Sequence, residues 1–128
     1  MGRSVGEYRI CFLDTAIRDI HHLRKKYPNI ERDIRSPLED LLKDDPHPGT
    51  PIRGAGKYRK LRIASSDIGE GKRAGFRIVL QVCDKYSRIL IIFVYAKKQR
   101  ENLLPHDIRG RIRRGLGNID LCEQFADC

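Results

Sequence analysis

Residues 75–96 read GFRIVLQVCDKYSRILIIFVYA, the most strongly strand-forming segment of the chain. Its two apolar runs, Gly75 to Cys83 and Arg88 to Tyr95, are rich in β-branched and aromatic residues, which favour strands. The residues between them, Asp84 to Ser87, have the composition of a turn. A short turn between two strands brings them side by side in opposite directions, so the stretch predicts an antiparallel hairpin.

Two more strands are predicted upstream of this hairpin. Residues 58–64 alternate between apolar and basic side chains, as a strand with one buried face does. Residues 65–74 (SSDIGEGKRA) are glycine-rich and suit the loop from that strand to the hairpin. Local connections of this kind give a three-stranded antiparallel meander. Residues 8–13 are short and mixed in polarity, and they predict a separate N-terminal strand.

A first helix is predicted directly after the N-terminal strand. Asp14 suits the N-cap position, and Pro28 is expected to end the helix. Between them, apolar residues recur at three- and four-residue spacing, which places them on one side of a helix. This apolar stripe consists of Ala16, Ile17, Ile20, Leu23 and Tyr27.

A second helix is predicted from Asn29, which can cap it, to about Lys43. Pro37 lies inside this segment, where it removes a backbone donor and clashes with the preceding turn. We therefore expect a kink or a restart at Ser36. Residues 44–51 have the composition of a loop.

A C-terminal helix is predicted for residues 102–114, interrupted by Pro105 and Gly110. The elements together predict an α+β fold, in which an N-terminal strand, a two-helix hairpin and a C-terminal helix accompany an antiparallel sheet with a three-stranded meander. The hairpin should cover one face of the sheet and leave the other open. One domain is expected over residues 1–114, followed by an acidic extension over residues 115–128.

Positive charge is concentrated in one half of the chain. Residues 1–50 carry nine basic and nine acidic residues, whereas residues 51–114 carry seventeen basic and only five acidic ones. Residues 115–128 carry three acids and no base, so the three segments account for the net charge of +9. Lysines that merely solvate a surface would be scattered, and the segregation therefore indicates a polyanionic partner.

The sequence argues against metal and membrane functions. The four cysteines form no CxxC pair and the histidines no H-x(3–5)-H pair, so we expect neither a metal site nor a cofactor. Cys11 and Cys83 lie in predicted strands and are expected as buried, reduced thiols. The longest apolar run, Ile89 to Ala96, is far shorter than a membrane span, and residues 1–9 hold no apolar stretch of a signal peptide. A cytoplasmic protein without a membrane partner is expected.

Three basic residues share one predicted sheet face. Lys60 and Arg62 are two residues apart on one strand, and Arg77 has the same orientation on the next. Cations gathered on an open face repel one another, which favours a site for an anion over a face that is only solvated. Arg100 follows the last strand, and His106, a candidate proton-transfer group, comes six residues later.

Four stretches of the chain resemble the RelE/ParE toxin superfamily, and they occur in the order and at the distances found there. They are AIRDI at 16–20 with Leu23, RKLRI at 59–63 with Ser65 and Ser66, GFRI at 75–78, and YAKKQREN at 95–102. The resemblance extends over about residues 8–114, and it includes the predicted order of strands and helices.

The resemblance implies a RelE-like toxin of a type II toxin–antitoxin system. Such toxins cleave mRNA in the ribosomal A site without a metal, by attack of a ribose 2′-OH on the adjacent phosphate, and a cognate antitoxin neutralises them. Lys60, Arg62, Arg77 and Arg100 match the family positions that surround the scissile phosphate. This chain has His106 where RelE has a tyrosine. Further contacts with RNA are expected from Arg59, Lys72, Arg73, Lys97 and Lys98.

The chemistry of RNA cleavage suggests individual roles for these residues. The reaction needs a base for the 2′-OH, cations for the phosphorane and an acid for the leaving oxygen. Arginine stays protonated, so Arg62, Arg77 and Arg100 can only supply charge. Lys60 beside three cations should have a lowered pKa, which makes it the candidate base and His106 the candidate acid. The reverse assignment of Lys60 and His106 remains open.

Two other functions are compatible with the same fold. A ParE-like toxin inhibits DNA gyrase by protein contact and would not need Lys60, Arg62, Arg77 and His106 to converge. A degenerate member would bind RNA or a protein partner without cleaving. Growth arrest with ribosome-dependent mRNA cuts, arrest with an SOS response, and no arrest distinguish the three.

Overall fold

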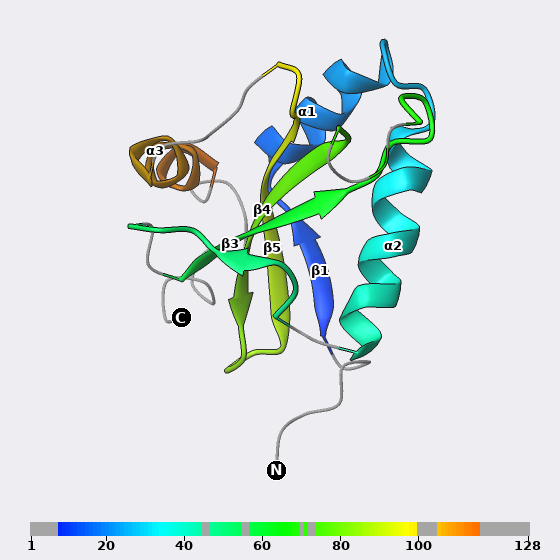
Figure 1. Ribbon diagram of the computed structural model, residues 1–128. Coiled ribbons are helices and arrows are strands. Elements are labelled where there is room, and N and C mark those ends of the chain that lie inside the picture. The colour runs from blue at the N-terminus through cyan, green and yellow to red at the C-terminus, as the bar shows by residue number, and fades with distance from the viewer. Residues whose placement is uncertain are drawn as a thin grey trace.

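A five-stranded mixed sheet forms the centre of the molecule, with helices on both of its sides (Figure 1). The strand order is β1-β5-β4-β3-β2. The computed structural model describes residues 8–44, 47–54, 57–69, 71, 74–99 and 105–115. The predicted α+β class is confirmed.

The three-stranded meander is also confirmed, with ends within one residue of the predicted ones. It consists of β3 (Tyr58–Ile63), β4 (Phe76–Cys83) and β5 (Arg88–Ala96). Both neighbouring pairs are antiparallel. A register shift at Val79/Leu80, between β4 and β5, marks a bulge in the ladder.

The two outer strands differ from the prediction. β1 (Arg9–Phe12) pairs with β5 in parallel, so the sheet is mixed and not antiparallel throughout. Parallel pairing is possible because two helices separate β1 from the meander, whereas a short hairpin would force the antiparallel direction. β2 (Thr50–Pro51) lies in the segment predicted as a loop and pairs with β3 at the opposite edge, where a proline is tolerated.

The two-helix hairpin is formed by α1 (Asp14–Arg24) and α2 (Ile30–Asp44). The N-cap of α1 is Leu13 rather than Asp14, without a side-chain cap bond, and Asp14 instead places its negative charge in the first turn. The apolar stripe is buried except for Ile17, whose 41% exposure places it at the edge of the stripe.

Pro37 does not divide the second helix. α2 continues through it as one helix and does not restart at Ser36, whereas the alternative expectation of a kink there stays a prediction. The apolar side of α2 explains the continuity, because Ile30, Ile34 and Leu38 before and after the proline are all buried in the same core. The free energy gained by burying these three side chains exceeds the cost of losing one helical hydrogen bond.

The C-terminal helix, α3 (Pro105–Gly115), begins at its proline and passes through Gly110 without a break. Proline suits the first helical position, where the backbone N–H would have no helical partner. The predicted interruption at Gly110 was wrong, since a single glycine weakens a helix by only about 1 kcal/mol. Residues 102–104, the predicted start of this helix, lie outside the described residues.

The core extends to both faces of the sheet at β5. Every residue from Ile89 to Ala96 is buried. The hairpin of α1 and α2 covers one face, whereas α3 packs on the other with Ile108 fully buried. The expectation of a fully open second face was therefore wrong, because α3 occupies part of it.

The two cysteines within the described residues differ in state. Cys11 is free, as predicted, but half-buried instead of buried, whereas Cys83 is disulfide-bonded, which corrects the expected reduced thiol. Its partner lies outside the described residues. In the part of the chain that the structure describes, no helix combines the length and the apolar character needed to span a membrane.

Candidate functional site

Arg62, Arg77 and Tyr95 form one cross-strand row on the face of the sheet that α3 partly covers. Arg62 on β3 lies directly opposite Arg77 on β4, and Arg77 lies opposite Tyr95 on β5. Directly paired residues project on the same side of a sheet, so the three side chains are neighbours. We call this set the arginine row.

Arg77 is nearly buried within the arginine row. The residue is only 4% exposed, and one of its guanidinium nitrogens donates to the carbonyl oxygen of Phe76 at 3.1 Å. Burial lowers the pKa of Arg77, and the neighbouring Arg62 lowers it further, whereas Tyr95 acts in the opposite direction. Arginine retains its proton at physiological pH despite such shifts. The site therefore holds a fixed positive charge in surroundings that penalise it.

Lys60 lies in the next row of the same face. It is paired with Val79 on β4, and Val79 is paired with Phe93 on β5. Because side chains alternate along a strand, Lys60 projects on the same side as Arg62. Lys60 is half-buried and Arg62 exposed, whereas Leu61 and Ile63 are buried against the helices. The predicted orientation of these four side chains is confirmed.

His106 lies in the first turn of α3. Pro105 at the start of α3 lies near Gly54, so the first turn of the helix is close to the segment before β3. Arg109 acts electrostatically on Tyr58, the first residue of β3, whose pKa is raised by burial and lowered to a smaller extent by that arginine. The His106 ring is exposed and lies 3.5 Å from the Asp107 carboxylate. The ring is thus accessible from solvent.

The loop between β3 and β4 is fixed to the start of α2 by two aspartates. Asp33 accepts hydrogen bonds from the backbone N–H and the hydroxyl of Ser66, at 2.8 and 2.9 Å. Asp67 accepts from the backbone N–H and the side-chain amide of Asn29, at 3.0 and 2.9 Å. These bonds hold the end of β3 next to Arg62 in a defined position.

A glycine allows β3 and β4 to approach closely at the same end. A Cβ atom built on Gly75 would lie 2.1 Å from the carbonyl oxygen of Ile63. This distance is a steric clash, so any residue other than glycine would push the two strands apart. The backbone N–H of Lys97 donates to the Gly75 carbonyl, so the turn after β5 is attached here too. Lys97 and Lys98 are exposed on that turn, beside the end of the sheet that carries the arginine row.

The remaining predicted site residues have different surroundings. Arg59 donates from its guanidinium to the carbonyl oxygens of Pro48 and Gly49, at 3.1 and 2.9 Å, and thus supports the segment leading to β2. Its contact with RNA stays a prediction. Lys72, Arg73 and Arg100 lie outside the described residues, as do residues 116–128 of the acidic extension.

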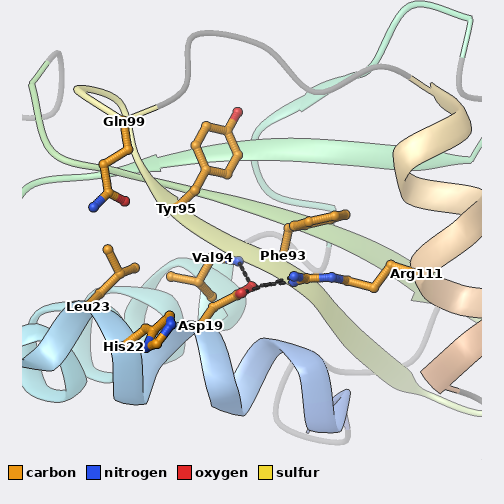
Figure 2. Close-up of a pocket in the computed structure, with 8 residues that line it drawn as sticks. All are labelled: Asp19, His22, Leu23, Phe93, Val94, Tyr95, Gln99 and Arg111. Atoms are coloured by element: carbon orange, nitrogen blue, oxygen red, sulfur yellow. Dashed lines mark hydrogen bonds and ion pairs between the residues drawn. The ribbon is translucent and has the colours of Figure 1, made fainter.

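A cavity of about 320 Å³ lies along the edge of β5, between α1 and α3. Figure 2 shows Asp19 of α1 at its floor, joined to the Arg111 guanidinium from α3 and to the backbone of Val94. Tyr95 and Gln99 border the opposite end. The cavity thus adjoins the arginine row at Tyr95.

The sequence reading missed Tyr95 and the pair of Asp19 and Arg111. Tyr95 lies opposite Arg77 only because of the particular register of β4 and β5, which includes a bulge, and no local pattern reports that register. Asp19 and Arg111 are 92 residues apart in the chain and are ordinary polar positions on their helices. Among the described residues, no group of histidine, cysteine, aspartate and glutamate side chains could hold a metal ion.

The sequence and the fold were compared with those of known proteins. No family model matches the sequence. Among solved structures, the chain is similar to a mutant of the E. coli toxin RelE in the free state, at a TM-score of 0.52 and 18% sequence identity. That alignment covers 84% of this chain and 97% of the RelE chain. The chain has the RelE fold.

A further similarity is to the toxin–antitoxin complex RelBE2 from Mycobacterium tuberculosis. Here the TM-score is 0.47 and the sequence identity 16%, over 70% of this chain and 91% of that one. The RelE fold confirms the architecture that the sequence resemblance implies, from the N-terminal strand to the C-terminal helix. At this identity the likeness concerns the fold, so the chemistry has to be argued from the residues of this chain.

Proposed function

We propose that this protein is a RelE-like toxin of a type II toxin–antitoxin system, which inhibits translation by cleaving mRNA in the ribosomal A site. The RelE fold and the family motifs of the sequence support the class of protein. The observation that carries the proposal is the opposition of Arg62 and Arg77 on the surface shared with Lys60. Like charges placed directly opposite each other destabilise a sheet, and a phosphate between them removes that cost.

The proposed reaction needs no metal. Lys60 takes the proton of the ribose 2′-OH, whose oxygen attacks the adjacent phosphorus. The leaving 5′-oxygen receives a proton from His106, so the products are a 2′,3′-cyclic phosphate and a 5′-hydroxyl. Arg62, Arg77 and Arg100 stabilise the negative charge that develops on the phosphorane. Buried charge is especially effective here because Arg77 needs little reorganisation when the transition state forms.

Other basic residues serve affinity in this proposal. Lys97 and Lys98 on the turn after β5, together with Arg59, Lys72 and Arg73, attract the RNA backbone without reading its sequence. An acidic or amphipathic antitoxin segment is the proposed natural inhibitor, since it would cover the same positive surface. Action on ribosomes also requires a cytoplasmic location.

Controlled expression in a bacterium tests the proposal. We expect the wild type to arrest growth and to produce new mRNA 5′ ends within translated regions, mapped by primer extension after brief induction. Lys60→Ala and Arg77→Ala should abolish both effects, because each removes a group from the reaction. Lys57→Ala is the matched control, since Lys57 is exposed just before β3 and has no part in the site.

The outcomes separate the alternatives. Full toxicity of both Lys60→Ala and Arg77→Ala, with the proteins folded and present at wild-type levels, would overturn the assignment of the site. Arrest accompanied by an SOS response instead of mRNA cuts would identify a gyrase inhibitor. Absence of arrest by the wild type would indicate a binding module without cleavage.

A further inference from the structure

Arg111 connects three elements through a single side chain. Its guanidinium donates to both carboxylate oxygens of Asp19 on α1, with Nη2 at 3.0 Å from Oδ1, and to the carbonyl oxygen of Ile92 on β5 at 3.2 Å. It also stacks over the ring of Phe93, with Cζ 3.6 Å from the ring centroid. A planar group with several donors can make these contacts together, whereas an ammonium cannot.

Asp19 completes the connection from the other side. Besides accepting from Arg111, its Oδ2 accepts from the backbone N–H of Val94 at 3.1 Å. β1 pairs with β5 only as far as Ile91, so Ile92 and Val94 lie on the part of the strand edge beyond that partner. The pair of Asp19 and Arg111 thus bonds to the backbone at this edge. Figure 2 shows the bond between Asp19 and Val94.

The pair also fixes α3 to the molecule. Isolated helices as short as α3, which has 11 residues, are marginal in water, so its position depends on its tertiary contacts. Ile108 is buried and Ile112 packs against the core, but apolar contacts alone do not determine the rotation and shift of a helix along a sheet. The directional bonds of Arg111 supply that constraint, and both side chains are less than 20% exposed.

We propose that the Asp19–Arg111 pair positions α3 so that His106 reaches the scissile phosphate. His106 and Arg111 are five residues apart, about 7.5 Å along the helix axis, so the bonds of Arg111 in the middle of α3 determine the place of the ring near its start. This inference rests on the proposed function, because it assigns Arg111 a role that is exerted through His106. Arg111 and Asp19 are positioning residues and touch no substrate in this account.

A charge-conserving variant separates positioning from attraction of RNA. Arg111→Lys keeps the positive charge but loses the bidentate contact, so binding of the RNA should be unchanged while α3 loses its directional anchor. Single-turnover cleavage by purified full-length protein on ribosomes with a programmed A-site codon should slow by about tenfold or more. Arg113→Lys, an exposed position on the same helix, is the matched control and should cleave like the wild type.

The His106→Ala background supplies the decisive comparison. If Arg111 acts through His106, adding Arg111→Lys to His106→Ala should slow cleavage by less than about twofold, since neighbours that act as a unit are not additive. The part of the pH dependence of the cleavage rate that is lost in His106→Ala should also be smaller in Arg111→Lys than in the wild type. An equal slowing in both backgrounds, or wild-type rates for Arg111→Lys, would overturn the inference.

Hydrogen exchange measures the anchoring itself, independently of activity. The amides of α3 should exchange faster in Arg111→Lys and in Asp19→Asn than in Arg113→Lys, with the exchange of β4 unchanged. Equal exchange in all three proteins would refute the anchoring role. A wild type that fails to cleave would reject the proposed function instead. The exchange rates of α3 would still test its anchoring by Arg111 and Asp19.

Discussion

Arg62 and Arg77 face each other across β3 and β4, and this opposition should be measurable as a loss of stability. Replacing Arg62 by glutamine removes the repulsion while keeping a polar side chain at an exposed position. We expect Arg62→Gln to raise the free energy of unfolding by about 0.2–1 kcal/mol, the usual size of a cross-strand charge effect. Urea denaturation at low ionic strength measures it.

Salt provides the control for this prediction. Screening reduces repulsion at an exposed site, so the gain from Arg62→Gln should shrink as the salt concentration rises. Arg53→Gln, at an exposed turn position outside the ladder, should leave stability unchanged. A loss of stability in Arg62→Gln would mean that Arg62 supports the fold, and the functional interpretation of the arginine row would lose its basis.

Cys11 offers a pH-dependent test at the residue scale. Burial raises the pKa of its thiol above the ordinary value of 9.0, although Arg88 and Arg9 oppose the shift. A raised pKa means less thiolate at any given pH, and the thiolate is the species that reacts. Alkylation of Cys11 in the folded protein at pH 8, followed by peptide mass spectrometry, should be slower than in urea. Equal rates would contradict the burial effect.

The alternation of apolar and basic residues was sufficient to predict the orientations of Lys60, Arg62 and Arg77. In a strand with one buried face, this alternation shows which side chains point to which side of the sheet. It could not reveal Tyr95 as the third member of the arginine row. That placement depends on the register across β4 and β5 after a bulge, and register is a property of two segments together. The position of His106 likewise depends on tertiary contacts of α3.

At the scale of elements, Pro37 should reduce the stability of α2. The helix continues through the proline, so one backbone hydrogen bond is missing from its interior. We expect Pro37→Ala to stabilise the protein by about 1–3 kcal/mol, seen as a higher melting temperature. This value is an upper estimate, because proline lowers the conformational entropy of the unfolded chain and so favours folding. Replacement by alanine removes that contribution.

The neighbouring Ser36 provides the comparison for Pro37. Ser36 is exposed in the same turn, and Ser36→Ala changes only a weak helix preference. Its effect should stay below about 0.5 kcal/mol. If Pro37→Ala destabilised the protein by more than Ser36→Ala, the proline would be favourable to α2 and the explanation of its continuity would fail.

The elements that sequence predicted well are those with strong local patterns. β3, β4 and β5 alternate or are uniformly apolar, and α1 has an apolar stripe. The parallel direction of β1 and the pairing of β2 were missed, because both depend on a distant strand. The continuity of α2 was missed for a related reason, since local propensity at Pro37 was overridden by burial of the residues around it.

At the scale of the whole molecule, the segregated positive charge predicts a strong dependence of RNA binding on salt. Each phosphate contact releases counterions, so affinity for a single-stranded RNA should fall steeply between about 50 and 200 mM salt. Arg77→Ala should weaken binding without changing its lack of sequence preference, because contacts to phosphate carry no sequence information. Fluorescence anisotropy with two unrelated oligonucleotides of equal length measures both properties.

The central claim is that the surface of Lys60, Arg62 and Arg77 cleaves mRNA within the ribosome. The most direct measurement combines purified protein, ribosomes and a defined mRNA, with 5′ ends mapped by primer extension and end chemistry tested by phosphorylation. We expect a cut at the A-site codon that leaves a 5′-hydroxyl, requires ribosomes, persists with EDTA-treated toxin, and disappears with Arg77→Ala. An uncut mRNA with the wild type, or an unchanged cut with Arg77→Ala, would contradict the central claim.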